Sequence, residues 1–236
     1  MPSQRPVPSA PIPRHPVRPG PSAFTLPELL VVIAILGILA TLLLASGARP
    51  IALARGVACR QHLRQWGLAT RSYADDHDDH LPPEGFPNPG DRHTNLGWYV
   101  QLPLQIGLPR YHDQPWRTNP ASRIPISPWL CPANRRRSNG NNLFHYCLNQ
   151  HVDGTQDDEH PTRLGDIPSP SLTPWLFDTK NLPAVGSWNF PHTNLHSGGA
   201  HFLCLDGHAE LVPAPVYWDF DKNRPRTNSG RLRWIP

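Results

Sequence analysis

The strongest constraint on this chain is an apolar run of membrane-spanning length near its N-terminus. Residues 24–45 contain one charged side chain, Glu28, and consist almost wholly of aliphatic residues. As a helix, this run spans about 33 Å, which is enough to cross the hydrocarbon core of a bilayer. A carboxylate inside such a segment costs at least ~2.5 kcal/mol. Glu28 therefore needs a partner that neutralises it, and it is the first candidate functional residue.

The segment before this run is a short basic leader. Residues 1–23 contain Arg5, Arg14 and Arg18, no acidic residue, and eight prolines that prevent a regular helix. Positive charge before a span places the N-terminus in the cytoplasm. We therefore expect the rest of the chain to be extracytoplasmic, anchored in the inner membrane by a single pass. A plain anchor, with the Glu28 carboxylate at the membrane interface, is the alternative interpretation.

The leader, the apolar run and the position of Glu28 together resemble the class III signal of type IV pilins and type II secretion pseudopilins. In that family, a membrane peptidase cuts before the Phe and methylates the new amino terminus. The resemblance implies a cut between Ala23 and Phe24, and a Glu28 that pairs with the amino terminus of a neighbouring subunit in a filament. It also implies three kinds of partner: prepilin peptidase/methyltransferase, other pilin-like subunits and membrane lipid.

Two positions depart from the family's usual pattern. Ala23 stands where Gly usually precedes the cut, and Pro27 stands where an aliphatic residue is usual. Ala is also small, so we expect cleavage. Pro27 would be the fourth residue of the cleaved helix, where a missing N–H costs little because the first four have no intrahelical partner.

An amphipathic stripe follows the apolar run. Apolar and aromatic residues recur at three- and four-residue spacing, so the helix is expected to continue and to end in an acidic turn before Leu81. The stripe consists of Cys59, His62/Leu63, Trp66, Ala69/Thr70 and Tyr73.

A second motif lies near the C-terminus, where His196 is followed by nine residues and then by Asp206-Gly207. Residues 200–205 and 208–212 are expected to be two strands, joined at Asp206-Gly207 by a two-residue type I′ turn. This register would pair Phe202 with Leu211. Further strands are expected at residues 98–100, 129–132, 144–149 and 174–178.

Together with the N-terminal signal, this motif resembles the prepilin-type processing-associated H-X9-DG proteins. The resemblance implies an α+β fold: a long N-terminal spine helix, membrane-spanning in its first half, packed on a small antiparallel β-sheet in a loop-rich, pilin-like head. We expect five segments: the leader 1–23, a transmembrane half-helix 24–46, an amphipathic half-helix 47–80, an extracytoplasmic α+β domain 81–221, and an irregular basic tail 222–236.

Four cysteines in an oxidising compartment are enough for two disulfides. Cys59 and Cys131 are the first candidate pair. Cys147 and Cys204 lie in expected strands, as a cross-strand pair or as two buried thiols.

Two groups of residues are candidate cation sites. His196, Asp206 and His208 offer a metal-ligand set, and the alternative is that they only shape the loop and turn. Asp75, Asp76, Asp78 and Asp79 offer oxygen ligands for Ca²⁺ at a helix end, and a solvated acidic turn is the alternative. We expect no resident cofactor unless one of these sites binds calcium or another divalent metal.

The net charge and the motifs narrow the classes of function that we expect for this chain. Removing the three leader arginines from the 22 basic residues leaves 19 against 18 acidic ones, so the charge indicates no nucleic-acid partner. No catalytic triad spacing, phosphate-binding glycine loop or paired catalytic carboxylate is present. We expect a filament subunit rather than an enzyme. The alternative is an anchored metal-binding, ligand-binding or catalytic protein that uses His196, Asp206 and His208.

Overall fold

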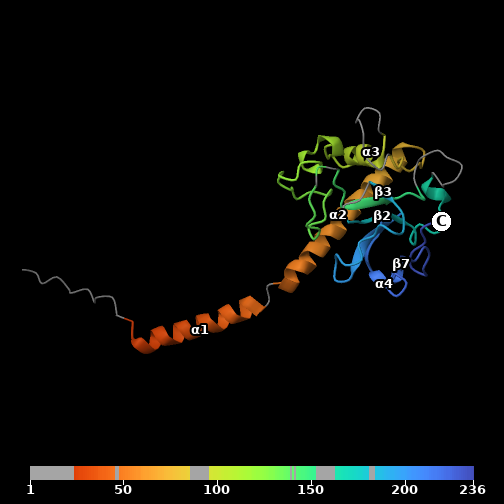
Figure 1. Ribbon diagram of the computed structural model, residues 1–236. Helices are drawn as coiled ribbons and strands as arrows, with labels where there is room; N and C mark the ends of the chain where they lie inside the picture. The colour runs from red at the N-terminus through yellow and green to blue at the C-terminus, as the bar shows by residue number, and fades with distance from the viewer. Residues whose placement is uncertain are drawn as a thin grey trace, which may run out of the picture. The chain divides into compact units, whose positions relative to one another are not determined.

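The computed structural model describes residues 24–45, 48–85, 96–138, 140, 142–152, 163–180 and 184–236 (Figure 1). The chain divides into two compact units, residues 1–47 and residues 48–236. The first contains helix α1 (Leu26–Ala45), and the second, which we call the head, contains all the later elements. The predicted leader with Ala23, and residues 46–47, lie outside the described residues.

Helix α2 (Ala48–Asp76) forms one side of the head. Every residue of the predicted stripe is buried, from Cys59 to Tyr73, so the helical spacing did identify the face that packs on the core. The helix ends where predicted. The N–H of Asp79 donates to Ala74 O at 2.9 Å, and Asp78 and Asp79 take positive φ angles of 54° and 65° that turn the chain away.

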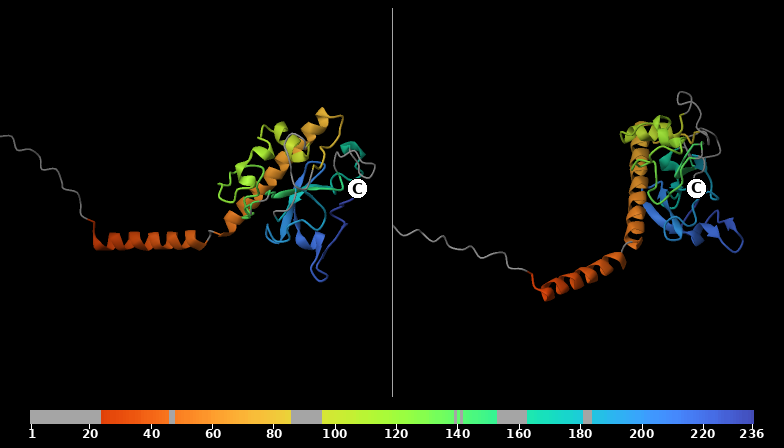
Figure 2. Two further views of the ribbon diagram at one scale, coloured as in Figure 1. Left: turned by 45° about the horizontal axis from the view of Figure 1, so that its top comes forward. Right: turned by 60° about the vertical axis from the view of Figure 1, so that its left-hand side comes forward.

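A five-stranded sheet packs against α2 and lies on one side of it (Figure 2). Its order is β3-β1-β2-β4-β5, and neighbouring strands are antiparallel except for the parallel pair β1–β3. The strands are β1 (Tyr146–Asn149), β2 (Pro174–Asp178), β3 (Val185–Gly186), β4 (Gly199–Cys204) and β5 (Ala209–Pro213). The α+β prediction of a helix packed on a small sheet is confirmed, and the sheet is mixed rather than wholly antiparallel.

Both faces of the sheet are buried. On the face toward α2, Leu176 and Leu203 join a core with Leu63 and Trp66 of the helix. On the far face, Phe177 and Phe202 pack against Trp234 near the end of the chain, and Trp234 is fully buried. The end of the predicted irregular tail therefore belongs to the core.

The remaining elements are short. They are helices α3 (Trp98–Gln105) and α4 (Ala214–Tyr217), the 3-10 turns η1 (Tyr111–Asp113), η2 (Pro115–Arg117) and η3 (Leu164–Asp166), and the strand pair β6 (Trp218–Asp219) and β7 (Arg224–Pro225).

Two strand predictions were wrong. Residues 98–100 form the first turn of α3, and residues 129–132 form a turn rather than a strand. Both stretches are short apolar runs with buried side chains, such as Trp98 and Trp129. Periodicity alone does not distinguish a strand from a helix or a buried turn over so few residues.

The predicted β4–β5 hairpin forms, but its turn differs. Phe202 pairs with Glu210 and Leu203 with Ala209, one residue out of the predicted register. Only Gly207 has a positive φ, of 89°, while Asp206 does not, so a type I′ turn is excluded. Gly207 N–H donates to Cys204 O at 2.9 Å, which closes a three-residue loop. Leu203 lies on the face of the sheet toward α2, and Phe202 lies on the far face.

Gly199 gives a test of this packing. A Cβ at Gly199 would collide with the carbonyl oxygen of Val212 in β5, and backbone atoms cannot move away cheaply. We predict that Gly199→Ala lowers the free energy of unfolding by about 1–3 kcal/mol. Urea unfolding of the full chain in detergent, followed by tryptophan fluorescence, measures it.

The matched control is Gly230→Ala, because a Cβ there meets open space. It should change stability by less than about 0.5 kcal/mol. Equal stability of the two variants would contradict the close approach of β4 and β5.

Candidate functional site

The N-terminal end of α1 carries the predicted processing and assembly residues. Thr25 precedes the helix, and its carbonyl oxygen accepts the N–H of Leu29 at 3.2 Å. Glu28 Oε2 accepts the backbone N–H of Thr25 at 2.8 Å and the Thr25 hydroxyl at 2.7 Å. This is half of a capping box, in which the third helical residue satisfies the amide of the residue before the helix. Pro27 is the second helical residue, where its missing N–H has no partner to lose.

Apart from Glu28 and Thr41, the described side chains of α1 are apolar, and they are exposed. Phe24 is 79% exposed, and the aliphatic residues from Leu26 to Leu42 remain largely open on every side of the helix. No helix in the described part of the chain is both long enough and apolar enough to cross a membrane. The predicted transmembrane segment 24–46 stays a prediction.

A buried polar cluster in the head surrounds Asp178, the last residue of β2. Asp178 has no exposed surface. Its Oδ1 accepts a hydrogen bond from the Cys59 thiol of α2 at 3.1 Å, and its Oδ2 accepts the backbone N–H of His201 at 2.8 Å. The same Oδ2 lies 3.1 Å from Nε2 of His196. The carboxylate therefore connects α2, β2, β4 and the loop before β4.

Further groups complete this cluster. The Tyr146 hydroxyl lies 3.2 Å from Cys59 Sγ, and Cys131 Sγ lies 3.3 Å from His196 Nε2. Nδ1 of His201 is 3.4 Å from Asp178 Oδ2, but its orientation gives no hydrogen bond. We call this set the Asp178 cluster: Cys59, Cys131, Tyr146, Asp178, His196 and His201.

The cluster contains an ion pair at neutral pH. Burial opposes ionisation of Asp178, but the hydrogen bond and charge of His196, with the His201 ring close by, hold the pKa of the carboxyl well below its usual range. Burial also opposes the charge on His196, and the bonds to Asp178 and Cys131 raise its pKa to about 10. A carboxylate and an imidazolium thus stabilise one another away from water.

The four thiols are all free and buried. Cys59 and Cys131, the first predicted pair, interact within the Asp178 cluster without a bond between them. Burial raises the pKa of Cys59 well above its usual value. Burial also opposes ionisation of Cys131, yet hydrogen bonds with Cys59 and His196 lower its pKa. The predicted cross-strand pairing of Cys147 with Cys204 is wrong, because β2 lies between their strands.

The predicted metal sets do not come together. Among the described residues, the group of His, Cys, Asp or Glu side chains whose ligand atoms converge contains His196 but neither Asp206 nor His208. Asp206 and His208 bond to each other at 2.5 Å at the half-exposed β4–β5 turn, at the other end of β4.

The acidic turn after α2 is occupied by other contacts. Asp75 forms an exposed ion pair with Arg71 at 2.7 Å, and Asp79 Oδ2 accepts the N–H of Gly165 at 2.7 Å. Asp75, Asp76, Asp78 and Asp79 are all described, and they form no convergent ligand group. The geometry favours the solvated turn over the calcium site.

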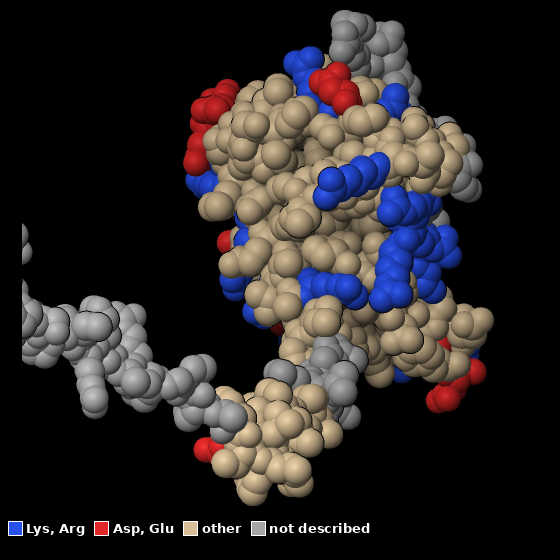
Figure 3. All heavy atoms as spheres, turned by 90° about the vertical axis from the view of Figure 1, so that its left-hand side faces the viewer, with Lys and Arg blue, Asp and Glu red and all other residues tan. Residues whose placement is uncertain are grey.

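Arginines line a hollow in the surface beside the Asp178 cluster. Lys and Arg side chains gather on one face of the head (Figure 3). A hollow of about 420 Å³ is lined by His196 and His201 together with Arg55, Arg60 and Arg135. Two histidines of the cluster therefore form part of the wall of this hollow, although both are largely buried.

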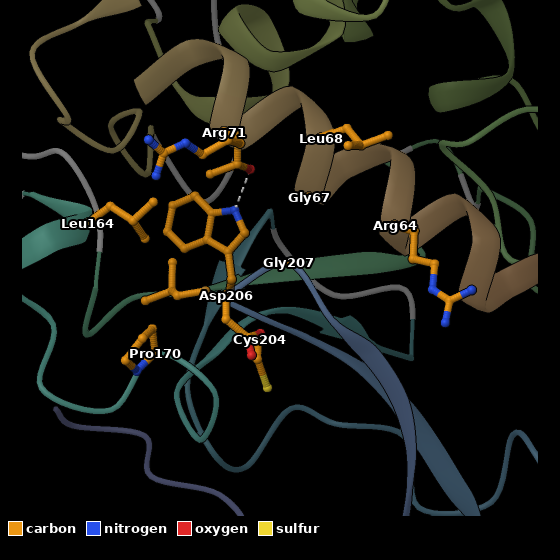
Figure 4. A pocket seen from close by; sticks show the side chains of 12 residues that line it. Arg64, Gly67, Leu68, Arg71, Leu164, Pro170, Cys204, Asp206 and Gly207 are labelled. Atoms are coloured by element: carbon orange, nitrogen blue, oxygen red, sulfur yellow. Dashed lines mark hydrogen bonds between the residues drawn. The ribbon is translucent and has the colours of Figure 1, made fainter. Parts of the chain in front are cut away.

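A second hollow, of about 550 Å³, lies between α2 and the β4–β5 turn (Figure 4). Asp206 and Gly207 form part of its wall, and Trp175 crosses it to donate its indole N–H to the Thr70 hydroxyl at 2.8 Å. At Gly67 of α2, an added Cβ would lie 3.0 Å from Leu203 and 3.4 Å from the Gly207 carbonyl oxygen. The turn of the His196 motif therefore packs directly on the helix.

Sequence reasoning found His196 but missed its partners. Asp178 was predicted only as the end of a strand, although a carboxylate closing an otherwise apolar strand was a usable signal. Cys59 and Cys131 were paired with each other, and nothing in their spacing indicated a carboxylate and two imidazoles beside them.

The chain matches the prokaryotic N-terminal methylation motif over residues 20–44. This motif supports a type IV pilin-like or pseudopilin precursor, and it implies processing by prepilin peptidase and association with pilin-like subunits. No curated protein and no solved structure matches the chain.

Asp178 gives a test of the cluster. We predict that Asp178→Asn lowers the free energy of unfolding by about 3–5 kcal/mol, because it leaves the His196 imidazolium buried without a counter-charge. Urea unfolding measures it. Asp206→Asn is the control, since its partly exposed carboxylate pairs locally with His208, and it should cost less than about 1 kcal/mol. Similar losses in both variants would contradict the role of Asp178.

His145 gives a test of pH dependence. Burial lowers its pKa to about 4, and its Nδ1 accepts the N–H of Cys131 at 3.1 Å. The imidazole of His145 therefore binds a proton more tightly in the unfolded chain than in the folded one. The free energy of unfolding falls as the pH drops from the unfolded pKa of 6.5 toward the folded pKa of about 4. We predict that the titration of His145 lowers the free energy of unfolding by about 2 kcal/mol when the pH changes from 7 to 5.

His145→Gln removes the titrating group and keeps an acceptor and a donor. Its unfolding free energy should fall less between pH 7 and pH 5 than that of the wild type. Parallel pH curves for the two proteins would show that His145 is not buried in its neutral form.

Proposed function

We propose that the chain is a pilin-like subunit, anchored in the inner membrane by its first helix, with the head extracytoplasmic. Prepilin peptidase would cut between Ala23 and Phe24 and methylate the new amino terminus. The subunit would then assemble through α1 into a secretion pseudopilus or a pilus. The observation that carries the proposal is the methylation motif at residues 20–44.

The geometry of Glu28 supports an assembly role. Its carboxylate is exposed and is bonded only to neutral groups of Thr25 in the contacts described above. A methylated ammonium from a neighbouring Phe24 would be a stronger, charge-assisted partner. In an apolar filament core, each charge would otherwise be buried uncompensated. The exposed aliphatic surface of α1 would be covered in the same step.

The pattern of His196 and Asp206-Gly207 supports the finer proposal that this subunit belongs to the H-X9-DG group. The alternative, an anchored binding protein or enzyme that uses His196, Asp206 and His208, is weakened by geometry. His196 is buried beside Asp178, whereas Asp206 and His208 pair with each other at the far turn. We propose a structural role for the chain rather than a catalytic one.

Glu28→Gln in a host that carries prepilin peptidase and the assembly machinery tests this function. The variant should be cleaved like the wild type, because the scissile bond is unchanged. Its assembled fraction should fall by about a hundredfold or more, since an unpaired buried ammonium costs about 3–5 kcal/mol. Sedimentation of sheared filaments, with immunoblotting of the membrane pool, measures both steps.

Gly230→Ala in the head is the control, because it leaves α1 unchanged and a Cβ at Gly230 meets open space. It should assemble at the wild-type level. If Glu28→Gln also yields normal filaments, Glu28 does not pair with a neighbour's amino terminus and the assembly mechanism is wrong.

A further inference from the structure

Four side chains of the Asp178 cluster converge as a ligand set. One ligand atom from each of Cys59, Asp178, His196 and His201 lies within 4.8 Å of the other three, and all four residues are buried. The four come from α2, the end of β2, the loop before β4, and β4 itself. A core polar group needs one or two hydrogen-bond partners, whereas this arrangement brings four metal-ligating side chains to a single point.

A second, independent observation is an unpartnered nitrogen aimed into this point. His201 is 4% exposed, and its Nδ1 has no hydrogen-bond partner. It lies 3.4 Å from Asp178 Oδ2 without the geometry of a hydrogen bond. Leaving a buried polar atom unpaired costs about 1–3 kcal/mol. A ligand that accepts the Nδ1 lone pair would remove that cost.

We propose that Cys59, Asp178, His196 and His201 form a tetrahedral binding site for a divalent cation of the zinc class. A thiolate, a carboxylate and two imidazoles are ligands that Zn²⁺ prefers. Bond lengths of about 2.0–2.3 Å place the ligand atoms of a tetrahedral zinc about 3.3–3.6 Å apart. Asp178 Oδ1 lies 3.1 Å from Cys59 Sγ, and Asp178 Oδ2 lies 3.1 and 3.4 Å from the nearest ring nitrogens of His196 and His201. All separations within the set are below 4.8 Å, so side-chain shifts of about 1 Å bring the four ligand atoms to tetrahedral spacing.

Charge and protons balance at this site. Zn²⁺ with the Cys59 thiolate, the Asp178 carboxylate and two neutral imidazoles has no net charge, which suits a buried position. Binding forms bonds to Cys59 Sγ and His196 Nε2 and releases one proton from each to water. The metal therefore replaces the imidazolium as the counter-charge of Asp178.

The surroundings provide an outer shell and a path. Tyr146 OH contacts Cys59 Sγ, and the His201 N–H holds Asp178 Oδ2. Such contacts orient metal ligands. The hollow of about 420 Å³ reaches His196 and His201. The arginines in its wall oppose entry of a cation, so we expect slow uptake and slow release.

The full chain, purified in detergent with a reductant and without chelator, tests the site. Metal analysis after incubation with Zn²⁺ and removal of excess should give about one zinc per chain. Co²⁺ in its place should give the intense visible bands of tetrahedral cobalt and a thiolate charge-transfer band. Cys59→Ser and His196→Gln should each reduce bound metal at least tenfold.

Two control variants separate binding from folding. His208→Gln and Cys147→Ser, both outside the Asp178 cluster, should keep the metal. Tryptophan fluorescence and circular dichroism of Cys59→Ser identify a variant that has merely unfolded. In that event Cys59→His, which preserves a ligand, should restore zinc and abolish the charge-transfer band.

Two results would overturn the proposal. One is a wild-type chain that binds neither Zn²⁺ nor Co²⁺ under reducing conditions. Another is a folded His196→Gln variant that retains its metal. The proposal does not depend on filament assembly, so failure of either leaves the other standing.

Discussion

Moving a carboxylate out of water costs free energy. Asp178 is fully buried in the head, and groups from three other segments converge on it to offset that cost. The Cys59 thiol comes from α2, the His201 amide from β4, and the His196 ring from the loop before β4. Each contact joins a segment to the end of β2. The helix, the central strand and the C-terminal hairpin are thus held together by polar contacts as well as by apolar packing. Removing the carboxylate takes one buried partner from the Cys59 thiol, the His201 amide and the His196 ring at once.

This arrangement gives the His-X9-Asp-Gly spacing a physical meaning. His196 lies just before β4 and Asp206-Gly207 just after it, so nine residues correspond to one strand of six with its flanking turns. At one end, His196 anchors the hairpin to Asp178. At the other, Gly207 packs on Gly67 of α2. The two parts of the motif hold opposite ends of β4, one to the end of β2 and the other to α2, which explains why they are not one binding site.

Local pattern predicted much of this fold. The α2 stripe, the end of α2, the strand at residues 174–178 and the hairpin all follow from spacing or turn chemistry over a few neighbouring residues. The hairpin register did not follow, because Asp206 and Gly207 suit a three-residue loop as well as a two-residue one. Residues 98–100 and 129–132 were misassigned because distant aromatic neighbours decide their structure.

The candidate sites differ in the same respect: one is contiguous in the sequence, and the other is assembled only by the fold. Phe24 and Glu28 belong to a contiguous signal that can be interpreted from the sequence, and the motif match over residues 20–44 agrees with it. The Asp178 cluster joins residues up to 142 positions apart, from Cys59 to His201. Only the folded sheet and helix bring these together. A sequence can indicate that His196 matters without indicating what it contacts.

The proposed function requires the first helix to be a processed assembly signal that is attached to the head. Intact-mass and N-terminal analysis of the chain, extracted from membranes of a host that carries prepilin peptidase, tests it most directly. We expect a chain that begins at Phe24 and carries one methyl group on its amino nitrogen. A chain that still begins at Met1 in the presence of active peptidase would contradict it.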